Sequence, residues 1–165
     1  MKKQPSIFND ALAPVSPGPS SSNTCGPSRI ARVGRQLFGK QPEKLMVEIS
    51  TKGNLILSFL GMRTDMAFLY GALGRTCTHE RFTHAYEDAK AEGLEMEYYF
   101  RGELPGFPTH MALLTFVGKD GERMTFKSAS VGGGAFCIDE INGCPVWIEG
   151  DQEETLLFTD LLTEN

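Results

Sequence analysis

Hydroxyl and amide side chains gather in one short stretch of this chain, residues 18–26, which read Gly-Pro-Ser-Ser-Ser-Asn-Thr-Cys-Gly. Gly18 and Pro19 interrupt regular structure, and Ser, Asn and Thr are the residue types that cap helix starts. A helical pattern of apolar residues follows, so hydroxyls and unpaired backbone N–H groups would converge at the positive end of a helix dipole, where carboxylate or phosphate can bind. The plain alternative is a capped helix start in a polar loop. The candidate anion-binding residues are Ser20, Ser21, Ser22, Asn23, Thr24 and Arg29.

The same stretch resembles the Gly-Pro-Ser-Ser-Ser-His-Thr signature of the β subunit, or β domain, of the iron–sulfur-dependent L-serine dehydratases. In that family the signature precedes a helix that carries an Arg. Residues 130–134, Ser-Val-Gly-Gly-Gly, resemble the family's Ser-Ile-Gly-Gly-Gly, and residues 32–39 resemble the end of its first helix. Residues 6–8 and 13–15 are similar to its opening. The resemblance covers roughly residues 6–150, nearly the whole chain.

The family's histidines are replaced in this chain. Asn23 stands where the signature has His, and residues 61–65, Gly-Met-Arg-Thr-Asp, stand where the family has Gly-His-Gly-Thr-Asp. The family's His-Pro-Asn is Phe-Pro-Thr at 107–109, and an upstream Gly-Ser is Gly-Asn at 53–54. Neither Asn23 nor Met62 can act as an acid or base near neutral pH. The resemblance therefore implies that the binding loops are retained and their imidazoles are lost.

In the family these loops face an active site that is shared with an α subunit. Arg63 could hold a carboxylate through a bidentate contact. Thr64 and Asp65 are the two residues to which the resemblance could give a catalytic role. The other ligand-binding positions that the resemblance implies are Gly53, Asn54, Met62, Thr109, Ser130, Gly132 and Gly133.

The resemblance also implies a partner and a cofactor. In the family, cysteines of the α subunit hold a [4Fe–4S] cluster, which takes the substrate hydroxyl as a Lewis acid while the β part positions the amino acid. We therefore expect no cofactor on this chain, a cluster-bearing α-type partner, and an amino-acid or hydroxy-acid ligand. Two alternatives stay open: a non-catalytic module that binds or senses an amino acid, and a structural domain whose loops only keep the fold. A homodimer is compatible with each.

The four cysteines, at positions 25, 77, 137 and 144, have no Cys-x-x-Cys spacing and match no cluster or zinc pattern. Cys77, His79 and His84 do not share one helix face, so we do not expect a metal there. A two-residue turn at Asn142-Gly143 would place Ile141 opposite Cys144. Cys137 would lie further along the ladder, and free thiols are expected.

The composition fits one soluble domain. The chain has 165 residues, a net charge of −5 and a pI near 5.2, which do not favour nucleic-acid binding. The most apolar run, residues 55–60, is too short to span a bilayer, and no secretory signal is present, so we expect a cytoplasmic protein without a membrane segment. The first helix is basic, with Arg29, Arg32, Arg35 and Lys40.

Helices early and hairpins late predict an α+β fold, an antiparallel or mixed sheet with helices on one face. The resemblance implies a similarity to the allosteric substrate-binding domain of some phosphoglycerate dehydrogenases. We expect an irregular segment over 1–22, the dehydratase-β-like domain over 23–150 and an acidic helix or tail over 151–165. Periodicity predicts helices over 26–38, 55–60, 64–73, 79–91 and 152–162, and strands over 45–49, 94–101, 111–117, 123–130, 135–141 and 146–149.

Overall fold

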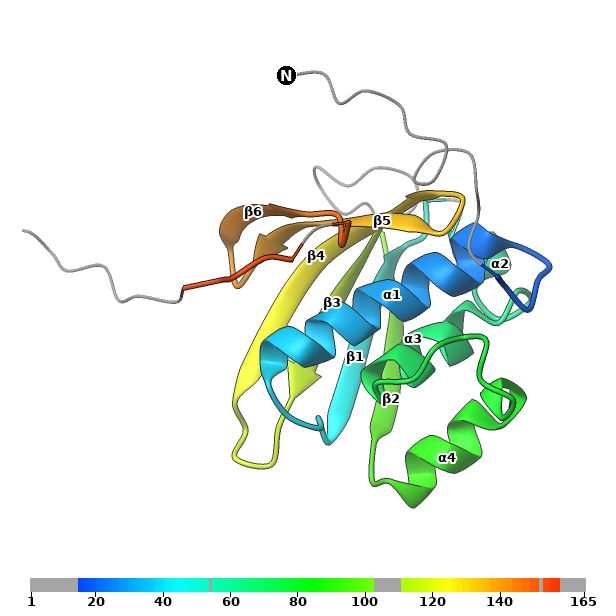
Figure 1. The fold of residues 1–165 in the computed structure, drawn as a ribbon, viewed down its shortest axis with the longest axis horizontal. Coiled ribbons are helices and arrows are strands. Elements are labelled where there is room, and N and C mark those ends of the chain that lie inside the picture. The colour runs from blue at the N-terminus through cyan, green and yellow to red at the C-terminus, as the bar shows by residue number, and fades with distance from the viewer. Residues whose placement is uncertain (1–14, 54, 103–110, 152, 158–165) are drawn as a thin grey trace, which may run out of the picture.

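Six strands form one mixed sheet, and the helices lie on one of its faces (Figure 1). A computed structural model describes residues 15–53, 55–102, 111–151 and 153–157. The predicted α+β class is confirmed. The elements are α1 (Ser21–Phe38), β1 (Lys44–Ser50), α2 (Leu55–Ser58), α3 (Thr64–Ala72), the 3-10 turn η2 (Phe82–His84), α4 (Ala85–Ala91), β2 (Glu95–Arg101), β3 (Met111–Val117), β4 (Arg123–Gly132), β5 (Ala135–Ile141) and β6 (Cys144–Ile148).

The strand order is β2-β1-β3-β4-β5-β6. β1 and β2 pair in parallel, and every other neighbouring pair is antiparallel. A parallel pair needs a crossover connection, and the segment from α2 to α4 supplies it. This crossover packs α3 against α1, while α1 itself crosses β3, β4 and β5 (Figure 1).

The core lies between α1, α3 and the sheet. Alternate residues of β1, namely Leu45, Val47 and Ile49, are fully buried, as the period of two requires for a strand with one covered face. Leu45 is paired with Phe116 of β3, whose ring meets the ring of Phe126 edge-on at 5.4 Å. The helix-facing side of the sheet thus carries most of the apolar packing.

Close approach of α1 and α3 depends on Gly71. A Cβ atom at this position would lie 2.3 Å from the carbonyl oxygen of Ser28 and 2.7 Å from Cβ of Ala31, both on α1. Gly71 sits in the interior of α3, where glycine is otherwise unfavourable. Its role is therefore to bring the two backbones together.

Helix α1 begins at Ser21, five residues before the predicted start. The peptide between Gly18 and Pro19 is cis, Ser20 is extended at φ −139° and ψ 120°, and helical geometry starts at the next residue. Pro27 is accommodated inside the helix. The prediction took Ser20 to Thr24 as capping residues ahead of the helix. The hydroxyl residues 21–24 therefore form the first turn of α1 and are not a loop ahead of it.

Three other predicted elements differ from the structure. The apolar run 55–60 forms only the four-residue helix α2, and Leu57 and Leu60 are exposed because they point away from the core. The predicted helix over 79–91 is a 3-10 turn followed by the shorter α4. The predicted helix over 152–162 is wrong for residues 153–157, which have no regular structure; its other residues lie outside the described ranges.

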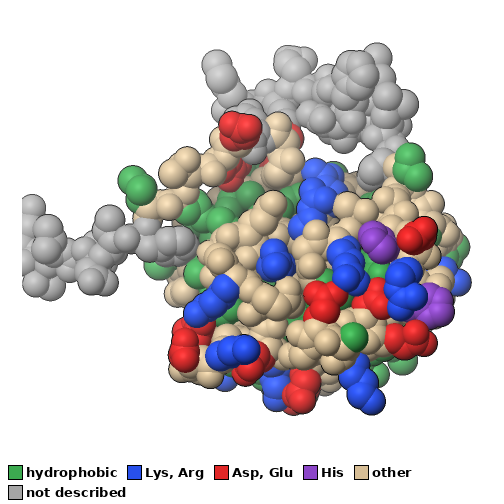
Figure 2. Space-filling view, turned by 60° about the horizontal axis from the view of Figure 1, so that its bottom comes forward, with side chains coloured by type: hydrophobic (Ala, Val, Ile, Leu, Met, Phe, Trp, Pro, Cys, Tyr) green, Lys and Arg blue, Asp and Glu red, His purple; other side chains and the backbone are tan. Residues whose placement is uncertain are grey.

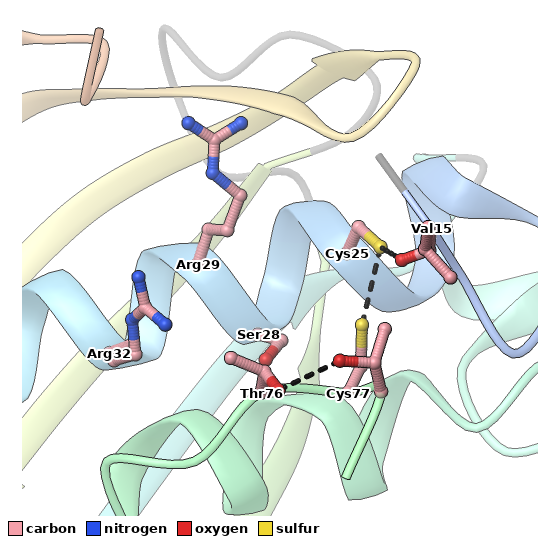
Figure 3. Close-up of a pocket in the computed structure, with 8 residues that line it drawn as sticks. Val15, Cys25, Ser28, Arg29, Arg32, Thr76 and Cys77 are labelled. Atoms are coloured by element: carbon pink, nitrogen blue, oxygen red, sulfur yellow. Dashed lines mark hydrogen bonds between the residues drawn. The ribbon is translucent and has the colours of Figure 1, made fainter. Parts of the chain in front are cut away.

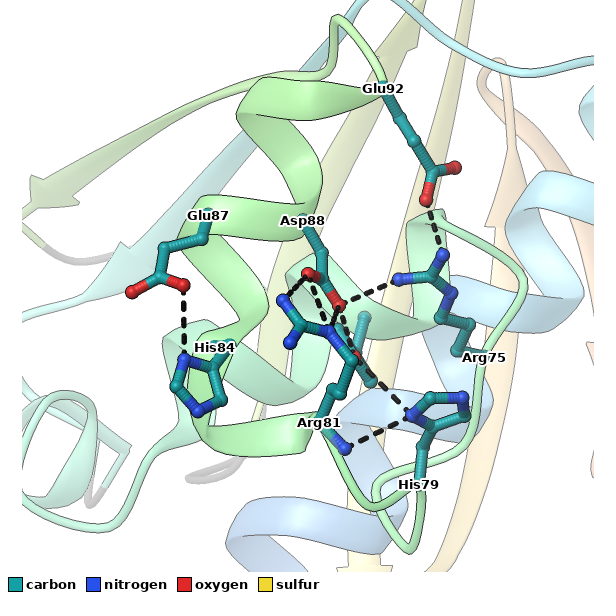
Figure 4. A network of polar contacts seen from close by, with 8 residues as sticks. Arg75, His79, Arg81, His84, Glu87, Asp88 and Glu92 are labelled. Atoms are coloured by element: carbon teal, nitrogen blue, oxygen red, sulfur yellow. Dashed lines mark hydrogen bonds and ion pairs between the residues drawn. The ribbon is translucent and has the colours of Figure 1, made fainter.

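A carboxylate at Asp88 on α4 fixes the connection between α3 and α4 (Figure 4). It accepts hydrogen bonds from Tyr70 Oη at 2.6 Å, Arg75 Nη1 at 2.8 Å and Arg81 Nε at 3.1 Å. Arg81 and then Tyr70 hold the pKa of Asp88 down at about 2. His79 lies beside Tyr70 with ring centroids 5.6 Å apart. This network anchors the segment that carries Cys77.

Charges of both signs share the surface seen in Figure 2, where Lys and Arg (blue) are interspersed with Asp and Glu (red). The net charge of −5 is therefore not gathered on that face. None of the helices in the described ranges combines the length and the apolar character that a membrane span needs.

Candidate functional site

The polar residues at the amino end of α1 bind mostly one another. Asn23 Nδ2 donates to Ser20 Oγ at 2.8 Å, and Thr24 Oγ1 donates to the carbonyl oxygen of Ser20 at 2.8 Å. Thr24 is fully buried, and its hydroxyl also meets Ser16 Oγ at 3.0 Å. Ser21 and Ser22 are half-buried. The first N–H groups of a helix have no intrahelical acceptor, so these two residues are the part of the turn that can bind an anion.

Ser58 joins the two positions at which the resemblance expects histidine. Its hydroxyl donates to Asn23 Oδ1 at 2.6 Å, and its carbonyl oxygen accepts from the backbone N–H of Met62 at 2.8 Å. Residues 23 and 62 are thus brought together although 39 positions separate them. Ser58 was not among the predicted site residues. A single polar residue within the apolar run 55–60 was the signal that could have identified it.

The glycine-rich motif also reaches this end of α1. Ser130 Oγ donates to the carbonyl oxygen of Ser22 at 2.7 Å. Gly132 and Gly133 have φ values of 105° and 60° in the turn between β4 and β5, where a side chain would be strained. The two motifs that carried the resemblance therefore meet in space.

Arg29 is held by the backbone of the same region. Its Nη1 donates to the carbonyl oxygen of Gly134 at 3.0 Å and its Nη2 to that of Gly150 at 3.3 Å, while the guanidinium lies 4.9 Å from the ring centroid of Phe136. Burial, with the nearby charge of Arg32, lowers the pKa of Arg29. These contacts show that Arg29 holds the segments around Gly134 and Gly150 against α1, whether or not it also contacts a ligand.

Two buried atoms at the start of α3 have no hydrogen-bond partner among the residues that the structure describes. They are Thr64 Oγ1 and Asp65 Oδ1, in residues that are 0% and 5% exposed. The other carboxylate oxygen of Asp65 accepts from Tyr86 Oη at 2.6 Å, and burial followed by this bond raises the pKa of Tyr86. Buried polar groups almost always have a partner. Thr64 Oγ1 and Asp65 Oδ1 therefore have unused hydrogen-bonding capacity within the described part of the chain.

Arg63 precedes them in a strained conformation. Its φ of 61° and ψ of 30° lie in the left-handed region, where the family pattern has glycine. For a residue with a side chain, this conformation is less stable than the right-handed one by roughly 1–2 kcal/mol. Such strain is typically kept at functional positions.

A groove runs beside α1 as two adjoining cavities of about 300 and 260 Å³. Val15, Cys77 and Thr78 line both. Arg29 and Arg32 line the first cavity (Figure 3), and Arg63, Ser16 and His79 line the second. Among the described residues the guanidinium groups of Arg32 and Arg63 make no hydrogen bond or ion pair. Glu80 also lines the second cavity, so three arginines and one carboxylate give the groove a net positive charge, which suits a small anion.

The first cavity contains a pair of thiols that the sequence did not reveal. Cys25 Sγ and Cys77 Sγ lie 3.2 Å apart (Figure 3), and both residues are buried. Cys137 and Cys144 are also free, and Ile141 pairs with Cys144 as the turn predicted. In the described ranges, no group of three or more His, Cys, Asp or Glu residues could hold a metal ion.

The structure brings many of the predicted site residues together and leaves others apart. Ser20 to Thr24 and Ser130 lie at the amino end of α1, and Met62 is linked to them through Ser58. Gly53 belongs to the turn after β1, where its N–H donates to the carbonyl oxygen of Ser50. Asn54 and Thr109 lie outside the described residues.

An exposed apolar patch adjoins this site. Phe59, which follows α2, packs on Tyr98 and Phe100 of β2, with ring centroids 5.2 and 5.9 Å away. Leu57 and Leu60 flank it and are 87% and 56% exposed. We call Leu57, Leu60, Tyr98 and Phe100 the α2–β2 patch. It lies next in sequence to residues 62–65.

Comparison with known proteins gives the family. The chain is 36% identical over 155 residues to the probable L-serine dehydratase β chain of Bacillus subtilis (strain 168), covering 94% of this chain and 68% of that protein. It is 29% identical over 148 residues to the L-serine dehydratase β chain of Peptoniphilus asaccharolyticus, covering 90% and 66%. It thus spans about two thirds of the length of these relatives. No family model matches it. With its two motifs joined at one helix end, the chain belongs to the L-serine dehydratase β-chain family.

Proposed function

We propose that this chain is the β-type subunit of a serine-dehydratase-like lyase, in which it binds and positions a hydroxy-amino acid for an α-type partner. The observation that carries the proposal is the unpartnered pair Thr64 Oγ1 and Asp65 Oδ1, buried in the segment that matches the family motif. Groups of this kind are costly in an isolated domain. A substrate or a partner that supplies their hydrogen bonds would account for them.

In this proposal the substrate carboxylate is bound by cationic and N–H groups of the chain. Arg63 offers a guanidinium that has no partner among the described residues, and the first turn of α1 offers Ser21 and Ser22 with their N–H groups. Ser16 connects the two places, because it lines the cavity of Arg63 and contacts Thr24. The strain at Arg63 supports a role in binding, since glycine would be easier to accommodate there.

The chemistry of hydroxyl removal belongs to the partner in this proposal. A [4Fe–4S] cluster on the α-type subunit would supply the Lewis acid. Asn23 and Met62 contribute no acid or base near neutral pH. The task of this chain is therefore to orient the amino acid and to exclude water.

The α2–β2 patch is the surface that we assign to the α-type partner. It is apolar and exposed, and it is continuous with the segment that holds Thr64 and Asp65. Exposed apolar patches rimmed by polar residues commonly mark protein interfaces. An α subunit seated there would lie beside the substrate and could complete the bonding of both side chains.

A non-catalytic amino-acid binding module is the second candidate. It is favoured by Asn23, whose amide is engaged on both sides, with Ser20 and with Ser58, and stands where the family has an imidazole. Such a module would bind a hydroxy-amino acid without a partner and would release no ammonia.

One experiment separates the two candidates. The chain is purified anaerobically, alone and after co-expression with a cluster-bearing α-type dehydratase subunit, and both samples are assayed for ammonia release from L-serine and other hydroxy-amino acids. The lyase proposal expects co-purification and ammonia release by the mixture alone. Heat of binding in calorimetry by the isolated chain, with no ammonia from the mixture, would support the binding module. Neither co-purification nor binding would contradict both.

Replacing Thr64 by valine should separate stability from function. Valine keeps the shape and removes an unpartnered buried hydroxyl, so the isolated chain should have an unchanged or slightly higher free energy of unfolding, by up to about 1 kcal/mol. Ligand affinity or ammonia release with the partner should fall roughly tenfold, because the complex would lack the hydrogen bond that we propose for the Thr64 hydroxyl. Urea denaturation and the ammonia assay measure the two effects.

Thr24→Val is the matched control. Thr24 is equally buried, but its hydroxyl is bonded to Ser20 and Ser16, so this change should destabilise the chain by about 1–2 kcal/mol. Thr64 would not belong to the site if Thr64→Val lowered the free energy of unfolding as much as Thr24→Val and left ligand affinity and ammonia release unchanged.

A further inference from the structure

Two thiols face each other across the groove from different parts of the chain. Cys25 lies in the second turn of α1, and Cys77 lies in the connection after α3, 52 positions later. Their sulfur atoms are 3.2 Å apart (Figure 3). A disulfide has its sulfur atoms about 2 Å apart, so a shift of about 1 Å would bring these two within bonding distance.

The surroundings of Cys25 favour its thiolate. The Cys77 thiol is the main donor to it, the Ser16 and Thr24 hydroxyls add to this, and the Arg29 guanidinium supplies positive charge. Together they lower the pKa of Cys25 against the opposing effect of burial. The same pairing raises the pKa of Cys77, with burial as the second cause. One sulfur is thus suited to attack and the other keeps its proton.

A small reagent has a route to the pair. Both sulfurs belong to the lining of the cavity of about 300 Å³, together with the exposed residues Thr76 and Thr78. The neutral Cys25 thiol also reaches the carbonyl oxygen of Val15, at the rim of that cavity. Thr76 and Thr78 flank Cys77 in an irregular connection, so its backbone can adjust more easily than that of α1.

The other two cysteines differ from this pair. Cys137 is buried on β5, opposite Ala129, and burial followed by the charge of Asp139 raises its pKa. Cys144 is exposed at the start of β6 and has Ile141 as its cross-strand neighbour. Of the four cysteines, Cys25 and Cys77 are therefore the two whose sulfur atoms face each other closely enough to react.

We infer that Cys25 and Cys77 form a peroxide-reactive dithiol site that closes to an intramolecular disulfide. The Cys25 thiolate attacks one oxygen of a hydroperoxide, the O–O bond breaks, and the leaving oxygen departs as hydroxide, or as alkoxide from an organic peroxide. The Cys77 sulfur then attacks the resulting sulfenic acid, and water leaves with the thiol proton. Two thiols lose two electrons in total, and the peroxide gains them. A dithiol reductant reverses the change.

Closure would alter the groove in which we place the ligand. The new bond would pull the segment with Thr76 and Thr78 towards α1 and narrow the cavity that Arg29 and Arg32 line. The inference stands without the proposed lyase function, because it concerns this chain alone.

The test uses the full chain with Cys144→Ser, which removes the exposed thiol. The reduced protein is freed of reductant and treated with equimolar hydrogen peroxide at pH 7. Thiol titration in denaturant should fall from three thiols to one, with peptide mapping showing a 25–77 disulfide that dithiothreitol reverses. The Cys77→Ser variant should stop at a sulfenic acid that dimedone traps on Cys25. The Cys25→Ser variant should react more slowly, by on the order of tenfold or more.

Mapping of the parent protein decides the question even if a cysteine variant fails to fold. A 25–77 disulfide formed at neutral pH supports the inference. Three thiols that persist, or oxidation of Cys137 in place of the pair, would overturn it. The pH profile gives a further readout: the oxidation rate of Cys25 should level off at a lower pH than that of a free thiol, whose pKa is about 8.5, and Cys77→Ala should move this plateau upward.

Discussion

Gly71→Ala is expected to lower the free energy of unfolding by about 2 kcal/mol. A single added methyl group would lie 2.3 Å from a backbone carbonyl oxygen of α1, a contact that only a shift of one helix can relieve. Overpacking in a core typically costs about 1–3 kcal/mol, and here the obstacle is backbone and not a flexible side chain. Helix propensity acts in the opposite direction by about 1 kcal/mol, so the steric effect decides the sign. Urea denaturation of the isolated chain measures the difference.

Gly102→Ala is the control for this prediction. A Cβ atom at Gly102 would meet nothing within 4 Å, so its substitution should change stability by less than about 0.5 kcal/mol. A Gly71→Ala protein that unfolds at the same urea concentration as the parent would show that α1 and α3 can separate without cost. In that case the position of Asn23 relative to residues 62–65 would not depend on their contact.

A double substitution in the α2–β2 patch, Leu57→Glu with Leu60→Glu, is expected to abolish co-purification with an α-type partner. Two carboxylates in the middle of an apolar interface would be desolvated without partners, which we expect to weaken binding by about 2 kcal/mol or more, about thirtyfold in Kd. Both side chains are exposed in the isolated chain, so its circular dichroism and melting temperature should stay as they are. Pull-down and calorimetry with the partner measure the loss.

Leu157→Glu is the matched control, because Leu157 is 85% exposed and lies in the irregular segment after β6. It should bind the partner like the parent chain. Equal losses for the control and the double variant would mean that added negative charge, and not the patch, governs association. Normal binding by the double variant would place the interface elsewhere.

Local patterns predicted the strands well because the signals that mark them are short-range. The alternation at Leu45, Val47 and Ile49 and the turn at Asn142-Gly143 both depend on neighbours only a few residues away. The parallel pairing of β1 with β2 depends on 44 intervening residues and had no local sign. The start of α1 was misplaced because residues 21–24, of types that usually cap a helix, form its first turn.

The candidate site could be predicted in part. The hydroxyl motif and the glycine motif were recognised separately, and the bond from Ser130 to Ser22 shows that they form one region. The bridging role of Ser58 and the facing thiols Cys25 and Cys77 could not be deduced, because both need contacts between residues at least 35 positions apart. Arg63 was chosen for its charge, whereas its backbone strain is visible only in the structure.

The crossover between β1 and β2 has a consequence for how this protein can change. One uninterrupted run of 44 residues, 51–94, contains Arg63, Thr64, Asp65, Cys77 and the two exposed leucines of the patch. It is attached at both ends to adjacent strands, and its helix α3 packs on α1. Ligand preference and partner choice can therefore change together through this one run, as long as the face of α3 that packs on α1 is kept.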